Sequence, residues 1–172
     1  MDFTLKKYLE LLRVLKDAGY RFVTFEQYCS EKAGLQDEKF VILRHDVDAK
    51  PKNSLATAEI EHSMGIKATY YFRVVRQSKK PEIIGRIAEW GGHEIGYHYE
   101  DMTICNGNAK ESITHFKNWL NYFRQYYPVK TICMHGSPRS KFDGRDLWQH
   151  CDYHDFGIIG EPYFDVDFSK VF

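Results

Sequence analysis

The 172-residue sequence lacks an excess of either charge, because 24 lysines and arginines balance 24 aspartates and glutamates. Partners such as nucleic acid or anionic membranes favour basic proteins, so the composition predicts no nucleic-acid partner. The sequence also has no apolar run long enough to cross a bilayer, which predicts no membrane span. Proline occurs only five times and hydrophobic residues make up 43%, as is typical of a folded globular domain.

Cysteine is sparse, and no two cysteines form a CxxC pair. The four positions are widely and unevenly spaced: Cys29, Cys105, Cys133 and Cys151. The first residues form an amphipathic segment without the apolar core and small-residue cleavage site of a signal peptide. We therefore expect free thiols in a cytoplasmic protein.

Several catalytic motifs are also missing. There is no GxGxxG or Walker-type loop, and no GxSxG elbow surrounds Ser137, the serine nearest to a predicted strand end. These absences argue against a phosphate-binding loop and against a serine nucleophile. Cys133 lies inside a predicted strand, where we interpret it as a small buried apolar side chain.

Short apolar runs alternate with segments of helical periodicity along the chain. Strands are expected at residues 40–43, 68–72, 94–97, 131–134 and 156–159, the first of them buried on both faces. Helices are expected at residues 5–15, 24–32, 53–64, 81–90 and 113–123. This alternation predicts an α/β fold with parallel strands. We expect one domain, in which a helical lead-in over residues 1–39 precedes a β/α core over residues 40–172.

Two carboxylates follow the first strand of this core. Asp46 and Asp48 are two residues apart, so in extended chain both side chains face the same side. Such a pair suits one metal ligand and one general base. Alternatively, Asp48 and Asn53 cap the next helix. Arg44 or Arg73 is expected to orient Asp46, and Arg73 could instead reach an acidic neighbour.

Histidines end two further strands, and the carboxyl ends of parallel strands are where ligand-binding groups collect. A catalytic zinc ion needs three protein ligands, of which Asp48 and His98 would supply two. His135, at the end of the fourth strand, is the favoured third ligand, and Glu100 is its rival. The other histidines that we considered are interpreted as structural or solvent-facing: His62, His93, His115, His150 and His154.

Three ordered motifs span the first three core strands: Arg44-His-Asp-Val-Asp48, Gly65-Ile-Lys-Ala-Thr-Tyr-Tyr-Phe72 and Gly92-His-Glu-Ile-Gly-Tyr-His98. Together they resemble the polysaccharide deacetylase family, also called the NodB-homology family or carbohydrate esterase family 4. The HDVD motif at residues 45–48 and the HYE motif at residues 98–100 are similar to those of a subgroup linked to surface-polysaccharide biosynthesis. This resemblance implies a distorted, incomplete (β/α) barrel, here truncated at its C-terminal end.

The same resemblance implies a hydrolase that removes an acetyl group from an N-acetylated sugar or glycan precursor, with a carbohydrate as its partner. Asp46 matches the catalytic base of the family motif, and Asp48 and His98 match metal ligands. The implied cofactor is a divalent metal, with zinc expected first. Zinc lowers the pKa of its bound water and polarises an amide carbonyl, and Asp46 would take the proton from that water.

Two departures from the family pattern leave other hypotheses open. Met102 stands where the family has its second histidine, and a thioether is a poor ligand in a nitrogen- and oxygen-rich site. We expect His135, or else Glu100, to replace it. No residue matches the late histidine that serves the family as general acid. The alternatives are an inactive deacetylase-like domain that binds a glycan or a partner enzyme, and a buried structural network of the HDVD and HYE residues.

Overall fold

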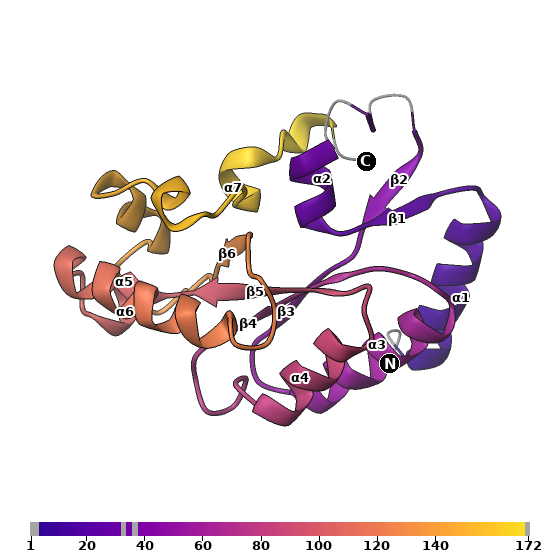
Figure 1. Ribbon diagram of the computed structural model, residues 1–172, viewed down its shortest axis with the longest axis horizontal. Helices are drawn as coiled ribbons and strands as arrows, with labels where there is room; N and C mark the ends of the chain where they lie inside the picture. The colour runs from indigo at the N-terminus through magenta and orange to yellow at the C-terminus, as the bar shows by residue number, and fades with distance from the viewer. Residues whose placement is uncertain (1–3, 32–33, 36–37, 171–172) are drawn as a thin grey trace.

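The computed structural model describes residues 4–31, 34–35 and 38–170, and its strands are all parallel (Figure 1). The larger sheet has the order β3 (Arg44–Val47), β4 (Thr69–Phe72), β5 (Glu94–Tyr99) and β6 (Ile132–Met134). A second sheet pairs β1 (Arg21–Val23) with β2 (Phe40–Ile42). The predicted α/β class with parallel strands is confirmed, and the larger sheet curls into half a barrel.

Helices connect the strands, and most begin and end where the sequence predicts. They are α1 (Leu5–Asp17), α2 (Phe25–Glu31), α3 (Pro51–Ser63), α4 (Pro81–Glu89), α5 (Asp101–Ile104), α6 (Ala109–Phe123) and α7 (Pro162–Asp165). Short 3-10 helices cover Gly144–Gln149, Tyr153–Phe156 and Phe168–Lys170. No helix among the described residues is both long and apolar enough to span a membrane.

The start of α2 shows how local sequence sets a helix boundary. The Thr24 hydroxyl accepts a hydrogen bond from the Gln27 backbone N–H at 3.1 Å, and the Gln27 side chain accepts one from the Thr24 N–H at 3.2 Å. This reciprocal pair is a capping box, which satisfies two donors that a helix start otherwise leaves free. The predicted cap is confirmed, whereas the predicted helix end at Lys32 lies outside the described residues.

The two faces of the larger sheet differ in chemistry because successive side chains of a strand point to opposite faces. One face is apolar and forms the main core with α3, α4 and α6; its strand residues include Val47, Tyr70, Phe72, Ile95, Tyr97, Tyr99 and Ile132. The other face, which we call the inner face, carries Asp46, Tyr71, Glu94, His98 and Cys133. Figure 1 shows α2 and α7 on one side of this sheet and α3 and α4 on the other.

Helix α2 is attached to the inner face through a buried carboxylate. Glu94 accepts hydrogen bonds from the Glu26 N–H at 2.8 Å, from the Thr69 hydroxyl at 2.8 Å and from the Thr131 hydroxyl. Burial raises the pKa of Glu94 from 4.5 to about 7, against the opposing effect of these donors. Helix α2 therefore covers the inner face at the amino end of β5, and the polar groups there are hydrogen-bonded within the fold.

The predicted strand over residues 40–43 is wrong in its extent and in its burial. Residues Phe40–Ile42 form β2, which is only half-buried and pairs with β1, so that Arg21 lies opposite Phe40. The chain changes sheets at Leu43, and β3 then begins at Arg44. The reason is that the extended segment before α2 supplies a pairing partner. The polar motif is consequently part of a sheet strand and does not follow one.

The predicted strand over residues 156–159 is also wrong. The 3-10 helix Tyr153–Phe156 occupies its start, capped by Asp152, whose side chain accepts a hydrogen bond from the His154 N–H at 2.9 Å. Gly157 follows with a φ of +71°, a left-handed conformation that interrupts extended chain. Only the bridge between Thr131 and Gly160 joins this described segment to the sheet.

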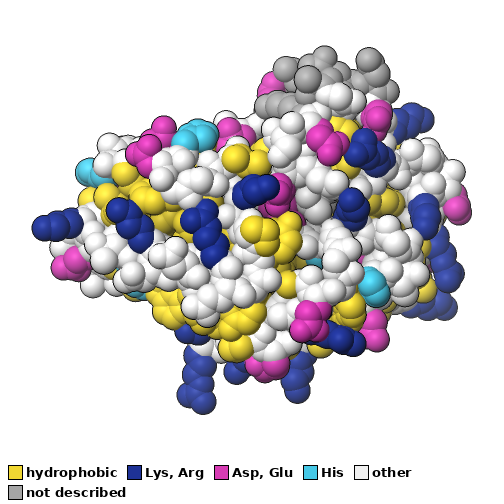
Figure 2. All heavy atoms as spheres, in the orientation of Figure 1, with side chains coloured by type: hydrophobic (Ala, Val, Ile, Leu, Met, Phe, Trp, Pro, Cys, Tyr) yellow, Lys and Arg dark blue, Asp and Glu magenta, His cyan; other side chains and the backbone are white. Residues whose placement is uncertain are grey.

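Figure 2 shows basic and acidic side chains spread together over one face of the molecule, with small apolar areas between them. This distribution agrees with the balanced charge of the sequence.

Gly96 gives a test of the packing on the inner face. A Cβ at this position would overlap the ring of Tyr71 and lie 3.1 Å from the carbonyl oxygen of Thr131. That ring is fully buried, and its hydroxyl is hydrogen-bonded to Thr131 Oγ1 at 2.8 Å. We expect Gly96→Ala to lower the free energy of unfolding by about 1–3 kcal/mol, the usual effect of overpacking a core.

Urea unfolding of Gly96→Ala beside Gly92→Ala measures this effect. Gly92 has no heavy atom closer than 4.0 Å to its added Cβ, so that variant is the matched control. Equal stability of the two variants would contradict the tight packing of Tyr71 against Gly96.

The raised pKa of Glu94 predicts how stability depends on pH. The native state keeps a proton on Glu94 that the unfolded chain loses between pH 4.5 and about 7. The contribution of Glu94 is therefore complete below pH 4.5 and declines as the pH rises to 7, by about 3 kcal/mol. In Glu94→Gln this decline should be absent, as measured by urea unfolding from pH 4.5 to pH 8. Parallel pH profiles of the two proteins would contradict this assignment.

Candidate metal centre

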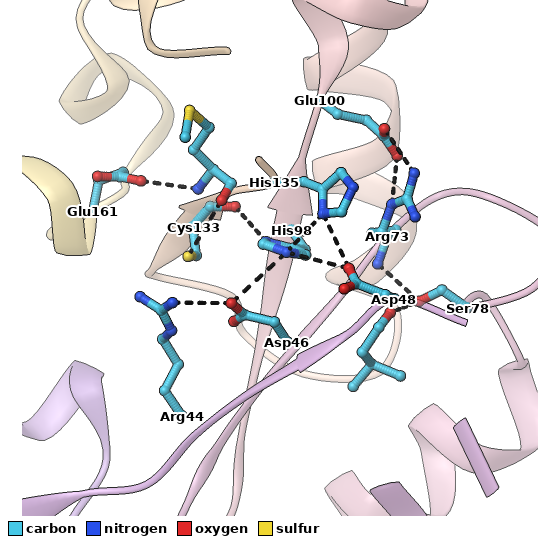
Figure 3. Close-up of polar contacts among 12 residues, drawn as sticks. Arg44, Asp46, Asp48, Arg73, Ser78, His98, Glu100, Cys133, His135 and Glu161 are labelled. Atoms are coloured by element: carbon cyan, nitrogen blue, oxygen red, sulfur yellow. Dashed lines mark hydrogen bonds and ion pairs between the residues drawn. The ribbon is translucent and has the colours of Figure 1, made fainter. Parts of the chain in front are cut away.

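Polar side chains from three strands meet at the carboxyl end of the inner face (Figure 3). The register places His98 of β5 directly opposite Cys133 of β6. Asp46 lies in β3, Asp48 follows it, and His135 follows β6. In Figure 3 the side chains of Asp46, Asp48 and His135 converge on the His98 ring.

His98 is the central residue of this cluster, and its side chain is only 3% exposed. Its Nδ1 lies 2.9 Å from the carbonyl oxygen of Cys133. Because a carbonyl oxygen can only accept, Nδ1 donates, and Nε2 keeps its lone pair in the neutral ring. Burial lowers the pKa of His98 to about 4, so the ring is neutral at pH 7. A neutral imidazole held by a backbone carbonyl is the usual form of a histidine metal ligand.

Asp48 and His135 complete a group of three potential ligands around His98 Nε2. His135 Nδ1 lies 3.0 Å from Asp48 Oδ1 and 3.2 Å from His98 Nε2. His98 Nε2 lies 3.6 Å from Asp48 Oδ1. The Asp48 side chain is 53% exposed, so the group opens to solvent on that side. These two nitrogens and one carboxylate oxygen could hold a metal ion.

Asp46 lies beside this group and is held by an arginine. Its Oδ2 lies 3.0 Å from Arg44 Nη2 and 3.9 Å from His98 Nε2. Burial raises the pKa of Asp46, and the guanidinium of Arg44 acts in the opposite direction. The expected contact between Arg44 and Asp46 is thus present, and it fixes one carboxylate oxygen toward His98.

Arg73 and Glu100 pair with each other instead of joining the cluster. The Arg73 Nε and Nη2 atoms donate to the two Glu100 carboxylate oxygens at 2.7 and 2.8 Å. Of the two alternatives expected for Arg73, the structure shows the contact with an acidic neighbour, Glu100, and Arg44 alone of the two candidates contacts Asp46. Glu100 lies outside the groups of potential metal ligands among the described residues. Met102 is buried in the main core, on the other side of the sheet.

Helix capping does not explain the position of Asp48. Lys50 occupies the N-cap position of α3, and its side chain makes no capping hydrogen bond. The alternative in which Asp48 and Asn53 serve as caps is thus contradicted. The Asp48 carboxylate instead faces the imidazoles of His98 and His135.

Two surface cavities are lined by residues that follow cluster residues in the chain. The first, of about 670 Å³, begins at Ala49 and is lined by the start of α3, by the start of α4 and by Arg76. The second, of about 490 Å³, lies between Thr103 and residues 137–142. Both volumes are in the range of small-molecule sites. Ala49, which directly follows Asp48, lines the first cavity, and Ser137, two residues after His135, lines the second.

The sequence interpretation missed the role of His45 and misplaced His115. His45 lies on the face of β3 opposite to the inner face, where its ring stacks on Tyr70. Its Nε2 lies 2.7 Å from Oε1 of the buried Glu61 carboxylate. Its alternation with Asp46 along the strand is a signal that could have separated the two faces. His115, expected to face solvent, is half-buried and lies 2.5 Å from the Asp101 carboxylate.

Comparison with known proteins adds no assignment for this arrangement. No family model, no curated protein and no solved structure matches the chain. The resemblance to polysaccharide deacetylases therefore remains a prediction from the motifs.

The cluster predicts metal binding that depends on His98. We expect the metal-stripped protein to bind one zinc ion. His98→Ala should weaken zinc binding by well over the roughly tenfold that is typical when a residue hydrogen-bonded to a metal ligand is lost. Glu100→Gln should leave the affinity unchanged, because Glu100 is paired with Arg73. Isothermal titration calorimetry at pH 7 measures the zinc affinity of the unmodified protein, His98→Ala and Glu100→Gln. Equal affinities of the unmodified protein and His98→Ala would contradict the assignment.

Proposed function

We propose that this chain is a metal-dependent hydrolase that removes an acetyl group from an N-acetylated sugar or glycan precursor. The observation that carries the proposal is the position of Asp46 beside the Asp48, His98 and His135 group on one sheet face. A metal site and an adjacent carboxylate are the two parts that metal-assisted amide hydrolysis requires. The sequence motifs support the same reaction.

The chemistry of the donors fits a zinc ion. His98 and His135 offer imidazole nitrogens, and Asp48 offers a carboxylate oxygen. The lowered pKa of His98 keeps its lone pair free at neutral pH, so no proton has to be displaced from Nε2. The exposed side of Asp48 provides the open position that a catalytic site needs for water or substrate.

Each residue of the cluster then has a defined task. Asp48, His98 and His135 would hold the ion, which when bound lowers the pKa of its water and polarises the substrate carbonyl. Asp46 accepts the proton of the attacking water at its carboxylate. Arg44 orients this carboxylate through the hydrogen bond to Oδ2.

The surroundings of the cluster support a sugar as the substrate. Tyr163 of α7 is exposed, and its ring centroid lies 5.8 Å from the Arg44 guanidinium carbon. An exposed aromatic ring next to the catalytic carboxylate offers an apolar surface on which a sugar ring can stack. The cavity between Thr103 and residues 137–142 provides space for a further sugar unit.

Release of acetate from N-acetylated amino-sugar oligosaccharides tests this proposal directly. With zinc bound, we expect Asp46→Asn to lower kcat by about 10²–10⁴-fold, the usual contribution of a general base. Asp46→Asn should still bind zinc, because it retains Asp48, His98 and His135. Asp155→Asn, which removes an exposed carboxylate from a distant 3-10 helix, is the matched control.

Zinc binding without acetate release from any acetylated sugar would contradict the hydrolase. It would favour the second candidate, an inactive deacetylase-like domain that binds a glycan. The observation behind this second candidate is Met102, which is buried in the core at the position of the expected second histidine.

A further inference from the structure

Cys133 is the one residue at the cluster whose chemistry the proposed function does not use. Its side chain is fully buried and lies on the inner face, because Cys133 pairs with His98 in the parallel register. The Sγ–H points to the Met134 carbonyl at 3.7 Å, which is a weak hydrogen bond. On its other side the thiol packs against Phe25 and Tyr71. Figure 3 shows Cys133 next to the His98 ring and on the side away from His135.

Asp46, His98 and Cys133 form a second group of potential metal ligands. One ligand atom from each of these residues lies within 4.8 Å of the others. This group shares His98 with the group of Asp48, His98 and His135. His98 offers only Nε2, because its Nδ1 is bonded to the Cys133 carbonyl. A single ion can therefore use one group or the other at a given time.

We propose that Cys133 is a metal ligand and that, with Asp46 and His98, it forms an inner position for a zinc-class ion. The outer position is that of Asp48, His98 and His135. Binding at the inner position forms a metal–sulfur bond and releases the thiol proton to solvent.

The charges and the surroundings of the inner position favour this occupant. One thiolate and one carboxylate together neutralise a divalent cation, which suits a buried position walled by Phe25 and Tyr71. Arg44 is hydrogen-bonded to Asp46 and adds a positive charge beside these anionic ligands. A thiolate ligand selects zinc, cobalt or cadmium over magnesium and calcium.

The inner position also has a consequence for activity, and this part of the inference rests on the proposed function. An ion bound there occupies the carboxylate of Asp46, which is the proposed base. The inner position would then be a resting state, and movement of the ion to the outer position would release Asp46 for proton transfer.

Cobalt(II) titration of the metal-stripped protein tests the inner position, because a cobalt–thiolate bond gives a charge-transfer band in the near ultraviolet. We expect this band in the unmodified protein and its loss in Cys133→Ser and in His98→Ala. It should remain in His135→Ala, which removes only an outer ligand, and in the presence of excess magnesium. The zinc affinity of Cys133→Ser should fall by about tenfold or more.

A second variant keeps the test valid if Cys133→Ser does not fold, which circular dichroism would show. The triple variant Cys29→Ser, Cys105→Ser, Cys151→Ser retains Cys133 alone and should keep the full band. Loss of the band in this triple variant, or its absence when cobalt is bound to the unmodified protein, would overturn the inference. Acetate release does not enter this readout: a band without hydrolysis contradicts only the proposed function, and hydrolysis without a band contradicts only the inner position.

Discussion

The parallel register of β3, β4, β5 and β6 sets the rows of side chains on the inner face, and the candidate metal centre depends on it. His98 and Cys133 are paired residues, so both side chains project to the same side. Asp46 lies opposite Tyr71, which in turn lies opposite Gly96, and this glycine leaves room for the tyrosine ring. A shift of one residue in any strand would move its polar side chains into the apolar core.

The fold contains further buried carboxylates, and their partners distinguish them from the candidate centre. Glu61 accepts hydrogen bonds from two tyrosine hydroxyls, Glu94 from two threonine hydroxyls, and Glu161 from backbone N–H groups of Met134 and Tyr163. These bonds attach α1, α2 and α7 to the sheet, and they satisfy each carboxylate within the protein. The aspartates of the cluster instead face imidazole and guanidinium nitrogens at an edge that reaches solvent. That difference marks the cluster as the place where an external cation can bind.

The sequence predicted the α/β class and most helices, because helical periodicity, capping residues and glycine stops are local signals. It did not predict that the chain changes sheets at Leu43, since this depends on β1, a distant partner. For the site, the strand-end positions of His98 and His135 were readable from the apolar runs before them. For Arg73 the sequence allows either the site or an acidic neighbour, and the choice of Glu100 depends on the spacing between strands. The burial of Cys133 among apolar side chains confirms the prediction from the apolar run around it.

His98 Nε2 lies at the centre of the candidate metal site on the inner face. Crystals of the zinc-loaded protein, measured at the zinc absorption edge, test it most directly. An anomalous peak about 2.0–2.1 Å from His98 Nε2, with Asp48 and His135 or Asp46 and Cys133 as its other ligands, is the predicted result. A fully loaded crystal with its zinc elsewhere, and His98 Nε2 free, would contradict the account.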